Sequence, residues 1–171
     1  MWFLDFQYYQ IGDEIFPKEI NLLHHDTVKQ GITFFAKSPT DYNFPTSAHS
    51  TLAYQYGRHK TPWNHGSVTD WKSILMSIIE PGETVCVKGS LKATFLQKNG
   101  FNALNVDTIG VTKSNPNGDC KSMQKLYEER KAKGHEPVKK CQFHVIHRGV
   151  CAVANTYVMR EWYLNYNYDC A

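Results

Sequence analysis

The chain has 171 residues, of which 42% are hydrophobic and 20% charged, and a formal net charge of +3. This composition excludes a disordered or fibrous protein, and the length suits one domain over residues 1–171. No apolar run approaches the ~18 residues of a spanning helix, so we expect no membrane partner. The first five residues carry no basic segment, so we expect no signal peptide and an intracellular protein, cytoplasmic or nuclear, with its five cysteines reduced.

The first part of the chain predicts three strands joined by short turns. Residues 2–9 are rich in aromatic side chains and fit the two-residue period of a strand. Gly12-Asp13 predicts a turn into a second strand at about residues 14–23, and a third strand follows at 31–35. Short connections between successive strands predict an antiparallel meander.

The remaining sequence predicts alternating helices and strands. An amphipathic helix, with Ser67 or Thr69 as its N-cap, has an apolar stripe formed by Trp71, Ile74, Leu75, Ile78 and Ile79. A buried strand at 84–87 and a second helix, capped by Ser90, come next. They precede a strand near 103–106, a basic helix that starts at about Met123, and a last helix over about 152–166.

Strands that are linked by helices are typically parallel, because the crossover connection returns the chain to the same edge. We therefore predict an α/β fold with one mixed sheet, in which three antiparallel strands are followed by two parallel strands and helices flank the sheet. This order of elements is that of RNase H-like domains.

Cys141, His144 and Cys151 form the pattern C-x2-H-x6-C. Two ligands separated by two residues can bind one ion from a single turn, and a third at the start of the next helix can close over it. Thiolates with an imidazole suit tetrahedral Zn²⁺. A structural site needs a fourth ligand, and the spacing leaves several candidates open, namely His147, Cys170, Cys120 or a carboxylate brought in by the fold.

From Trp2 to about Leu164 the chain resembles the Maelstrom domain, an RNase H-like domain related to the DEDD exonucleases and known from transposon-silencing proteins of animal germ cells. That family has a Glu-Cys-His-Cys zinc set. The resemblance implies Glu19 as the fourth ligand, with His147 as its rival, and a structural zinc ion that joins the second strand to the last helix. The full set would be Glu19, Cys141, His144 and Cys151.

The same resemblance implies that the exonuclease site is degenerate. The matching positions for the metal-binding acids are Asp5, Gln7, Lys92 and Asn155. Two-metal phosphodiester hydrolysis needs several carboxylates to hold two Mg²⁺ ions. Since a single Asp is left, we expect no exonuclease activity by that route, although Lys92 could still attract a phosphate.

The chain's charge is uneven, because eight basic and four acidic residues lie between Lys113 and Lys140. This segment therefore carries +4 and the rest of the chain −1. Interleaved charges are typical of a solvated helix face, and the alternative is a basic ridge that contacts phosphates. Candidate nucleic-acid contacts are Lys92, Lys121, Lys125, Arg130, Lys131, Lys133 and Arg148, and aromatic residues that could stack on bases are Tyr8, Tyr9, Trp63 and Tyr163.

These observations lead to three hypotheses for function. The first is a degenerate nuclease-like domain that binds single-stranded RNA, in transposon or small-RNA silencing as the resemblance implies. The second is an adaptor for protein partners, suggested by the aromatic segment at residues 162–168. The third, from the same resemblance, is metal-independent cleavage of single-stranded RNA; eight histidines could supply acid and base groups, but the sequence places none of them as catalytic.

Overall fold

A computed structural model describes residues 1–26, 28 and 30–169. Its strands are β1 (Trp2–Ile11), β2 (Glu14–His24), β3 (Ile32–Phe35), β4 (Thr84–Val87) and β5 (Asn102–Asn105). Its α-helices are α1 (His49–His59), α2 (Trp71–Ile78), α3 (Ser90–Lys98), α4 (Met123–Ala132), α5 (Gln142–His147) and α6 (Ala152–Asp169), and two short 3-10 helices lie at Thr46–Ala48 and Val106–Thr108.

The five strands form one mixed sheet in the order β3-β2-β1-β4-β5. β1 and β2 are antiparallel, as are β2 and β3, whereas β4 is parallel to both β1 and β5. The predicted α/β class and the predicted sequence of three antiparallel and two parallel strands are therefore confirmed.

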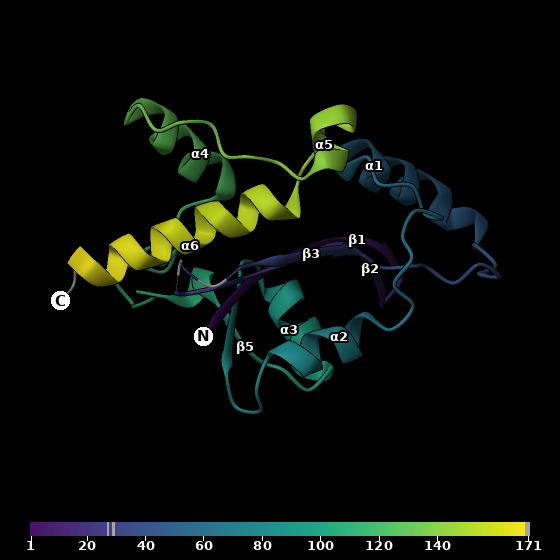
Figure 1. Ribbon diagram of the computed structural model, residues 1–171, viewed down its shortest axis with the longest axis horizontal. Helices are drawn as coiled ribbons and strands as arrows, with labels where there is room; N and C mark the ends of the chain where they lie inside the picture. The colour runs from purple at the N-terminus through teal and green to yellow at the C-terminus, as the bar shows by residue number, and fades with distance from the viewer. Residues whose placement is uncertain (27, 29, 170–171) are drawn as a thin grey trace.

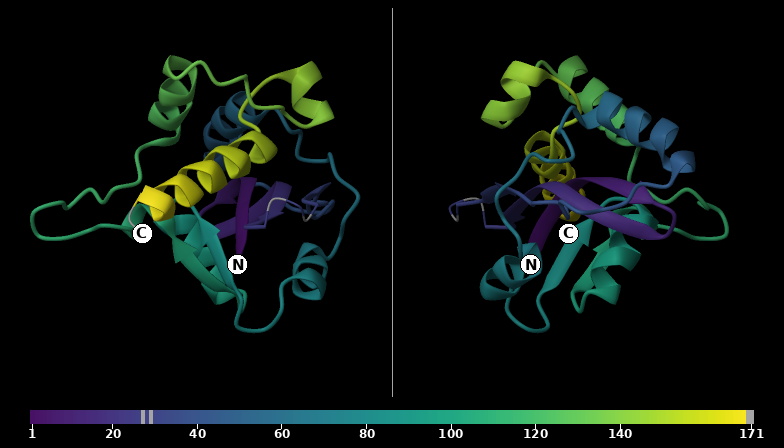
Figure 2. Two further views of the ribbon diagram at one scale, coloured as in Figure 1. Left: turned by 60° about the vertical axis from the view of Figure 1, so that its left-hand side comes forward. Right: turned by 90° about the vertical axis from the view of Figure 1, so that its right-hand side faces the viewer.

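Helices cover both faces of the sheet (Figures 1 and 2). The long helix α6 crosses one face above β1 and β2, and α2 and α3 lie against the other. β1 contributes to both cores, with Phe3 on the α6 side and with Leu4 and Phe6 on the α2/α3 side. Burial on both faces explains why this strand is apolar at most positions instead of alternating strictly.

Two helices were not predicted from the sequence. In α1 only His59 is buried, so the helix lacks the apolar stripe that would reveal it. α5 has six residues, too few to establish a helical period. The predicted caps were also wrong, because the Asp70 side chain accepts from the Ser73 amide at 3.0 Å at the start of α2, and Gly89 rather than Ser90 precedes α3.

The short length of β4 creates the place where a site can form. β4 pairs only with Trp2 and Phe3, so no strand in the described part of the chain covers this edge of β1 beyond Phe3. In open α/β sheets, ligands bind where neighbouring connections leave the sheet in opposite directions, next to the carboxyl ends of parallel strands.

None of the helices in the described ranges is long and apolar enough to cross a bilayer.

A fully buried lysine ties β2 to the segment after α1. Lys18 Nζ lies 2.6 to 3.0 Å from the carbonyl oxygens of Ala36, Trp63 and His65 and from Ser38 Oγ. Hydrogen bonds from a charged donor are stronger than those from a neutral one. The ammonium group therefore holds the loop that follows α1 against the sheet.

We predict that Lys18→Met lowers the free energy of unfolding by about 3 kcal/mol or more, because buried carbonyl groups lose their donor at ~1–3 kcal/mol each. Urea denaturation of the wild type and the variant measures this difference. Lys37→Met is the matched control, since Lys37 is exposed and should change stability little. Equal stability of Lys18→Met and wild type would contradict the prediction.

Candidate functional site

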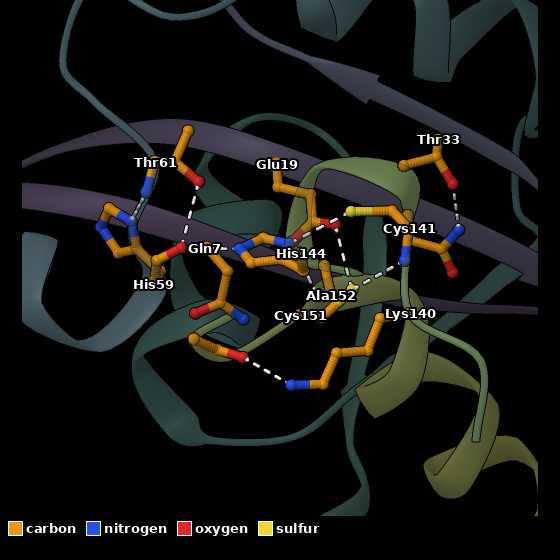
Figure 3. A network of polar contacts seen from close by, with 12 residues as sticks. Gln7, Glu19, Thr33, His59, Thr61, Lys140, Cys141, His144, Cys151 and Ala152 are labelled. Atoms are coloured by element: carbon orange, nitrogen blue, oxygen red, sulfur yellow. Dashed lines mark hydrogen bonds and ion pairs between the residues drawn. The ribbon is translucent and has the colours of Figure 1, made fainter. Parts of the chain in front are cut away.

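Four residues that are distant in the sequence meet beside β2 (Figure 3). They are Glu19 of β2, Cys141 and His144 at the start of α5, and Cys151 just before α6, and one ligand atom from each lies within 4.8 Å of the others. The predicted set is therefore brought together and could hold a metal ion. Within the described residues neither His147 nor Cys120 belongs to this cluster, and Cys170 lies outside them.

The spacing of the ligand atoms fits one ion. Cys141 Sγ lies 3.1 Å from His144 Nδ1, which lies 3.3 Å from Glu19 Oε2, and Cys151 Sγ lies 3.3 Å from Glu19 Oε1. Around a tetrahedral ion with metal–ligand bonds of ~2.0–2.3 Å, neighbouring ligand atoms are ~3.3–3.8 Å apart. These three separations are close to that range, and every pair of ligand atoms lies within 4.8 Å.

Hydrogen bonds from the surrounding backbone orient these ligands. His144 Nε2 donates to the carbonyl oxygen of His59 at 2.6 Å, which leaves Nδ1 to face the cluster. The Ala152 amide donates to Glu19 Oε2 at 2.8 Å, and the Cys141 amide donates to Cys151 Sγ at 3.3 Å. Such outer contacts fix the tautomer and direction of metal ligands.

A tight turn returns the chain from α5 to the cluster. Arg148 and Gly149 both have positive φ, at 62° and 84°. A Cβ on Gly149 would stand 2.8 Å from the carbonyl oxygen of Arg58, so only glycine allows this close approach to the end of α1. The Val150 amide then donates to the same Arg58 carbonyl at 2.9 Å, and Cys151 reaches the cluster.

The protonation states of the cluster also suit a metal site. The hydrogen bond with Cys141, opposed by burial, lowers the pKa of Cys151 to about 5, and the same bond together with burial raises the pKa of Cys141. Burial lowers the pKa of His144, but hydrogen bonds to Cys151 and Glu19 outweigh it and raise that pKa to about 10. Burial raises the pKa of Glu19, but hydrogen bonds from His144, Cys141 and the Ala152 amide bring it below its usual value. Without metal, these directions favour a protonated Cys141 and a protonated His144 beside a Cys151 thiolate.

A second polar group lies around Asp5 in the middle of β1. The Asp5 carboxylate forms an ion pair with Lys92 of α3 and accepts from Asn155 Nδ2 at 2.9 Å and from Gln7 Nε2 at 3.2 Å. Gln7, Lys92 and Asn155, the other three positions that the resemblance matched to exonuclease acids, thus converge on the Asp5 carboxylate. Tyr127 donates to Asn155 Oδ1 at 3.0 Å and closes the network from α4.

This network opens into a hollow of about 590 Å³, here called the basic hollow. Asp5 is the only acidic residue among its described lining residues. In the part of the chain that the structure describes, Arg58 and Lys140 have no ion-pair partner, whereas Lys88 pairs with Asp107 and Lys92 with Asp5. The hollow's basic side chains are Arg58, Lys88, Lys92 and Lys140.

The sequence identified only one of these four cations as a nucleic-acid contact. Of the candidates, Lys92 lines the basic hollow, while Lys121 and Arg130 form ion pairs with Glu129 and Glu161. The other candidates, Lys125, Lys131, Lys133 and Arg148, are exposed outside the hollow. Arg58 and Lys88 were missed because no local pattern marks them. Lys140 ends the basic segment that the sequence showed, but nothing in that segment distinguished it as a contact.

The aromatic residues that the sequence suggested for base stacking have different environments. Tyr9 is buried and donates to the carbonyl oxygen of Thr61 at 2.7 Å, so that suggestion was wrong. Trp63 packs within a group of rings, and Tyr163 packs against Phe3. Tyr8 is half-buried beside Lys92, whose Nζ lies 5.9 Å from the ring centroid.

Comparison with known proteins adds no relative to this description: no protein-family model, no curated protein and no solved structure matches the chain.

We predict that Cys141→Ser largely abolishes metal binding and lowers the free energy of unfolding by several kcal/mol, since binding at a structural site contributes about 10–16 kcal/mol. Metal analysis of purified protein and thermal unfolding measure both effects, with about one ion per wild-type chain expected. Cys120→Ala is the control, because Cys120 is a buried thiol outside the cluster. A metal-free wild type would refute the site.

We further predict that metal uptake at pH 7 releases about two protons, from Cys141 and His144. The apparent affinity should therefore rise with pH by about two logarithmic units per pH unit near neutrality. Calorimetric titrations in buffers of different ionisation enthalpy count the protons. Release of no proton would show that the cluster is already fully deprotonated and would contradict this protonation pattern.

Proposed function

We propose that the protein is a Maelstrom-like, RNase H-like domain that contains a structural zinc ion and binds single-stranded RNA in the basic hollow. The order of strands in the sheet and the convergence of Asp5, Gln7, Lys92 and Asn155 support the resemblance to the exonucleases. The observation on which the function depends is the hollow itself, with four cations around a single carboxylate.

Zinc is the metal that the ligand set favours. Two thiolates and an imidazole are soft or borderline ligands, which Mg²⁺ and Ca²⁺ do not prefer. When bound, zinc would supply a fixed cross-link rather than a reactive water, because four protein ligands leave no open position on a tetrahedral ion. Glu19, Cys141, His144 and Cys151 would hold it.

Single-stranded RNA is the ligand that the shape and charge of the hollow favour. Arg58 and Lys140 are exposed cations without acidic partners in the described structure, so they are available to phosphate oxygens. They lie in a hollow rather than along a convex ridge, and a flexible single strand can enter a hollow that a duplex cannot. The choice of RNA rather than DNA as the proposed ligand follows from the family resemblance.

Binding without two-metal hydrolysis is the expected outcome. Asp5 is already neutralised by Lys92, and its other hydrogen bonds come from amide groups of Asn155 and Gln7. Two Mg²⁺ ions require several carboxylate ligands, and the described lining provides one. The ammonium group of Lys92 occupies the position beside Asp5 that a cation would take.

Fluorescence polarisation with a labelled single-stranded RNA of twelve nucleotides tests this proposal. We predict that the double variant Arg58→Ala/Lys140→Ala binds roughly 10-fold or more weakly, because two charge-assisted contacts are lost. The slope of log affinity against log salt should fall by about 1.4, since each contact on a single strand contributes about 0.7. The RNA should stay intact in Mg²⁺.

The matched control is Lys125→Ala/Lys131→Ala, which removes the same charge from exposed positions of α4. We expect less than about twofold weakening for it. Equal weakening by both double variants would show a non-specific charge effect or binding along α4. Absence of binding by the wild type would refute the proposal, and cleavage that persists in EDTA would favour a metal-independent endonuclease.

A further inference from the structure

A second hollow, of about 320 Å³, continues the basic hollow along β1 and α1. The two hollows share three lining residues, Gln7, Arg58 and Lys92, so they form one groove with the shared residues at its junction. We call the second one the tyrosine hollow, because Tyr8 of β1 and Tyr54 of α1 both line it.

One face of α1 lines the tyrosine hollow. Thr51, Tyr54, Gln55 and Arg58 follow the i, i+3, i+4, i+7 spacing that places residues along one side of a helix. A helix stripe that faces its own domain is normally apolar, but this one has a hydroxyl, an aromatic ring, an amide and a guanidinium group. The neighbouring face, which includes Leu52 and Tyr56, lines a different, apolar hollow.

Tyr54 is the residue of this stripe whose aromatic ring is exposed to solvent. It is 66% exposed, and among the described residues its ring has neither a ring contact nor a side-chain hydrogen bond in the structure. α1 itself is held against β1, since the Gln10 amide donates to Gln55 Oε1 at 3.1 Å. The exposed ring is therefore presented from a helix whose position is fixed.

The two parts of the groove present different chemical groups to a ligand. At the junction, Arg58 offers a positive charge without an acidic partner in the described structure, and Lys92, which pairs with Asp5, offers a further ammonium group; both can donate to a phosphate. In the tyrosine hollow, Tyr54 offers a flat face, and Gln55 and Thr51 offer hydrogen-bonding groups. A flat heterocycle attached to a phosphate is the arrangement of a nucleotide within a strand, and every base can stack on an aromatic ring.

We propose that the tyrosine hollow is a nucleobase subsite, in which a base of a bound single strand stacks on Tyr54 while its phosphate lies between Arg58 and Lys92. This inference rests on the proposed RNA-binding function and adds a contact that depends on bases rather than on charge. It therefore makes predictions that phosphate binding alone does not make.

Polarisation titrations of Tyr54→Ala with two probes test the subsite. The probes are a labelled eight-nucleotide RNA and a strand of the same length without bases. Loss of one stacking platform should weaken the binding of the base-bearing RNA by roughly 5- to 100-fold and leave its salt slope unchanged. The abasic strand should bind the wild type and the variant equally, and Tyr54→Phe should retain wild-type binding of both.

Tyr56→Ala is the matched control, because Tyr56 is an exposed tyrosine on the same helix (44% exposed) that does not line the tyrosine hollow. Equal affinities of Tyr54→Ala and wild type for the base-bearing RNA would overturn the subsite, even if Arg58→Ala/Lys140→Ala weakens binding and the proposed function holds. Equal weakening of both probes by Tyr54→Ala would also overturn it. A wild type that binds no RNA would refute the proposed function together with this inference.

Discussion

The buried carboxylate of Glu19 is the constraint on which the remaining structure depends. A charge with no exposure in the middle of a sheet is strongly destabilising unless it is compensated. Here the compensation comes from the far end of the chain, because His144, Cys151 and the Ala152 amide all contact its oxygens. β2, α5 and the start of α6 therefore have to assemble together. A metal ion in this cluster would strengthen that cross-link.

The same assembly builds the walls of the basic hollow. His144 donates to the carbonyl of His59, and the Val150 amide donates to the carbonyl of Arg58, so the end of α1 is fixed by the chain around the cluster. Lys140 directly precedes Cys141, and its Nζ donates to the Gly149 carbonyl at 3.1 Å. Arg58 and Lys140, which have no acidic partner within the described residues, are thus positioned by contacts of the cluster residues and their neighbours. The cluster therefore fixes the positions of the residues that line the basic hollow.

Asp5 shows how a buried carboxylate can be satisfied by side chains alone. A carboxylate at this depth needs a cation or several donors, and Lys92 and two amides provide both. Gln7, Lys92 and Asn155 form a satisfied polar network with Asp5, and none of the three offers the carboxylate that a two-metal site needs. Under the proposed function, the retained network keeps the floor of the hollow in shape while the surrounding cations contact RNA.

Local patterns in the sequence determined the sheet and three members of the candidate metal-binding cluster, and the tertiary structure decided the rest. The periods of β1, α2 and α6, and the C-x2-H-x6-C spacing, are properties of adjacent residues, so they predicted the strands, most helices and three ligands. Glu19 came from the family resemblance, because a lone Glu in a strand carries no signal of its own. The cations Arg58, Lys88 and Lys140, and the exposed ring of Tyr54, belong to separate segments. Only the packing of α1, α3 and the α5 segment around one edge of β1 brings them into a single groove, and such long-range proximity has no periodicity in the sequence.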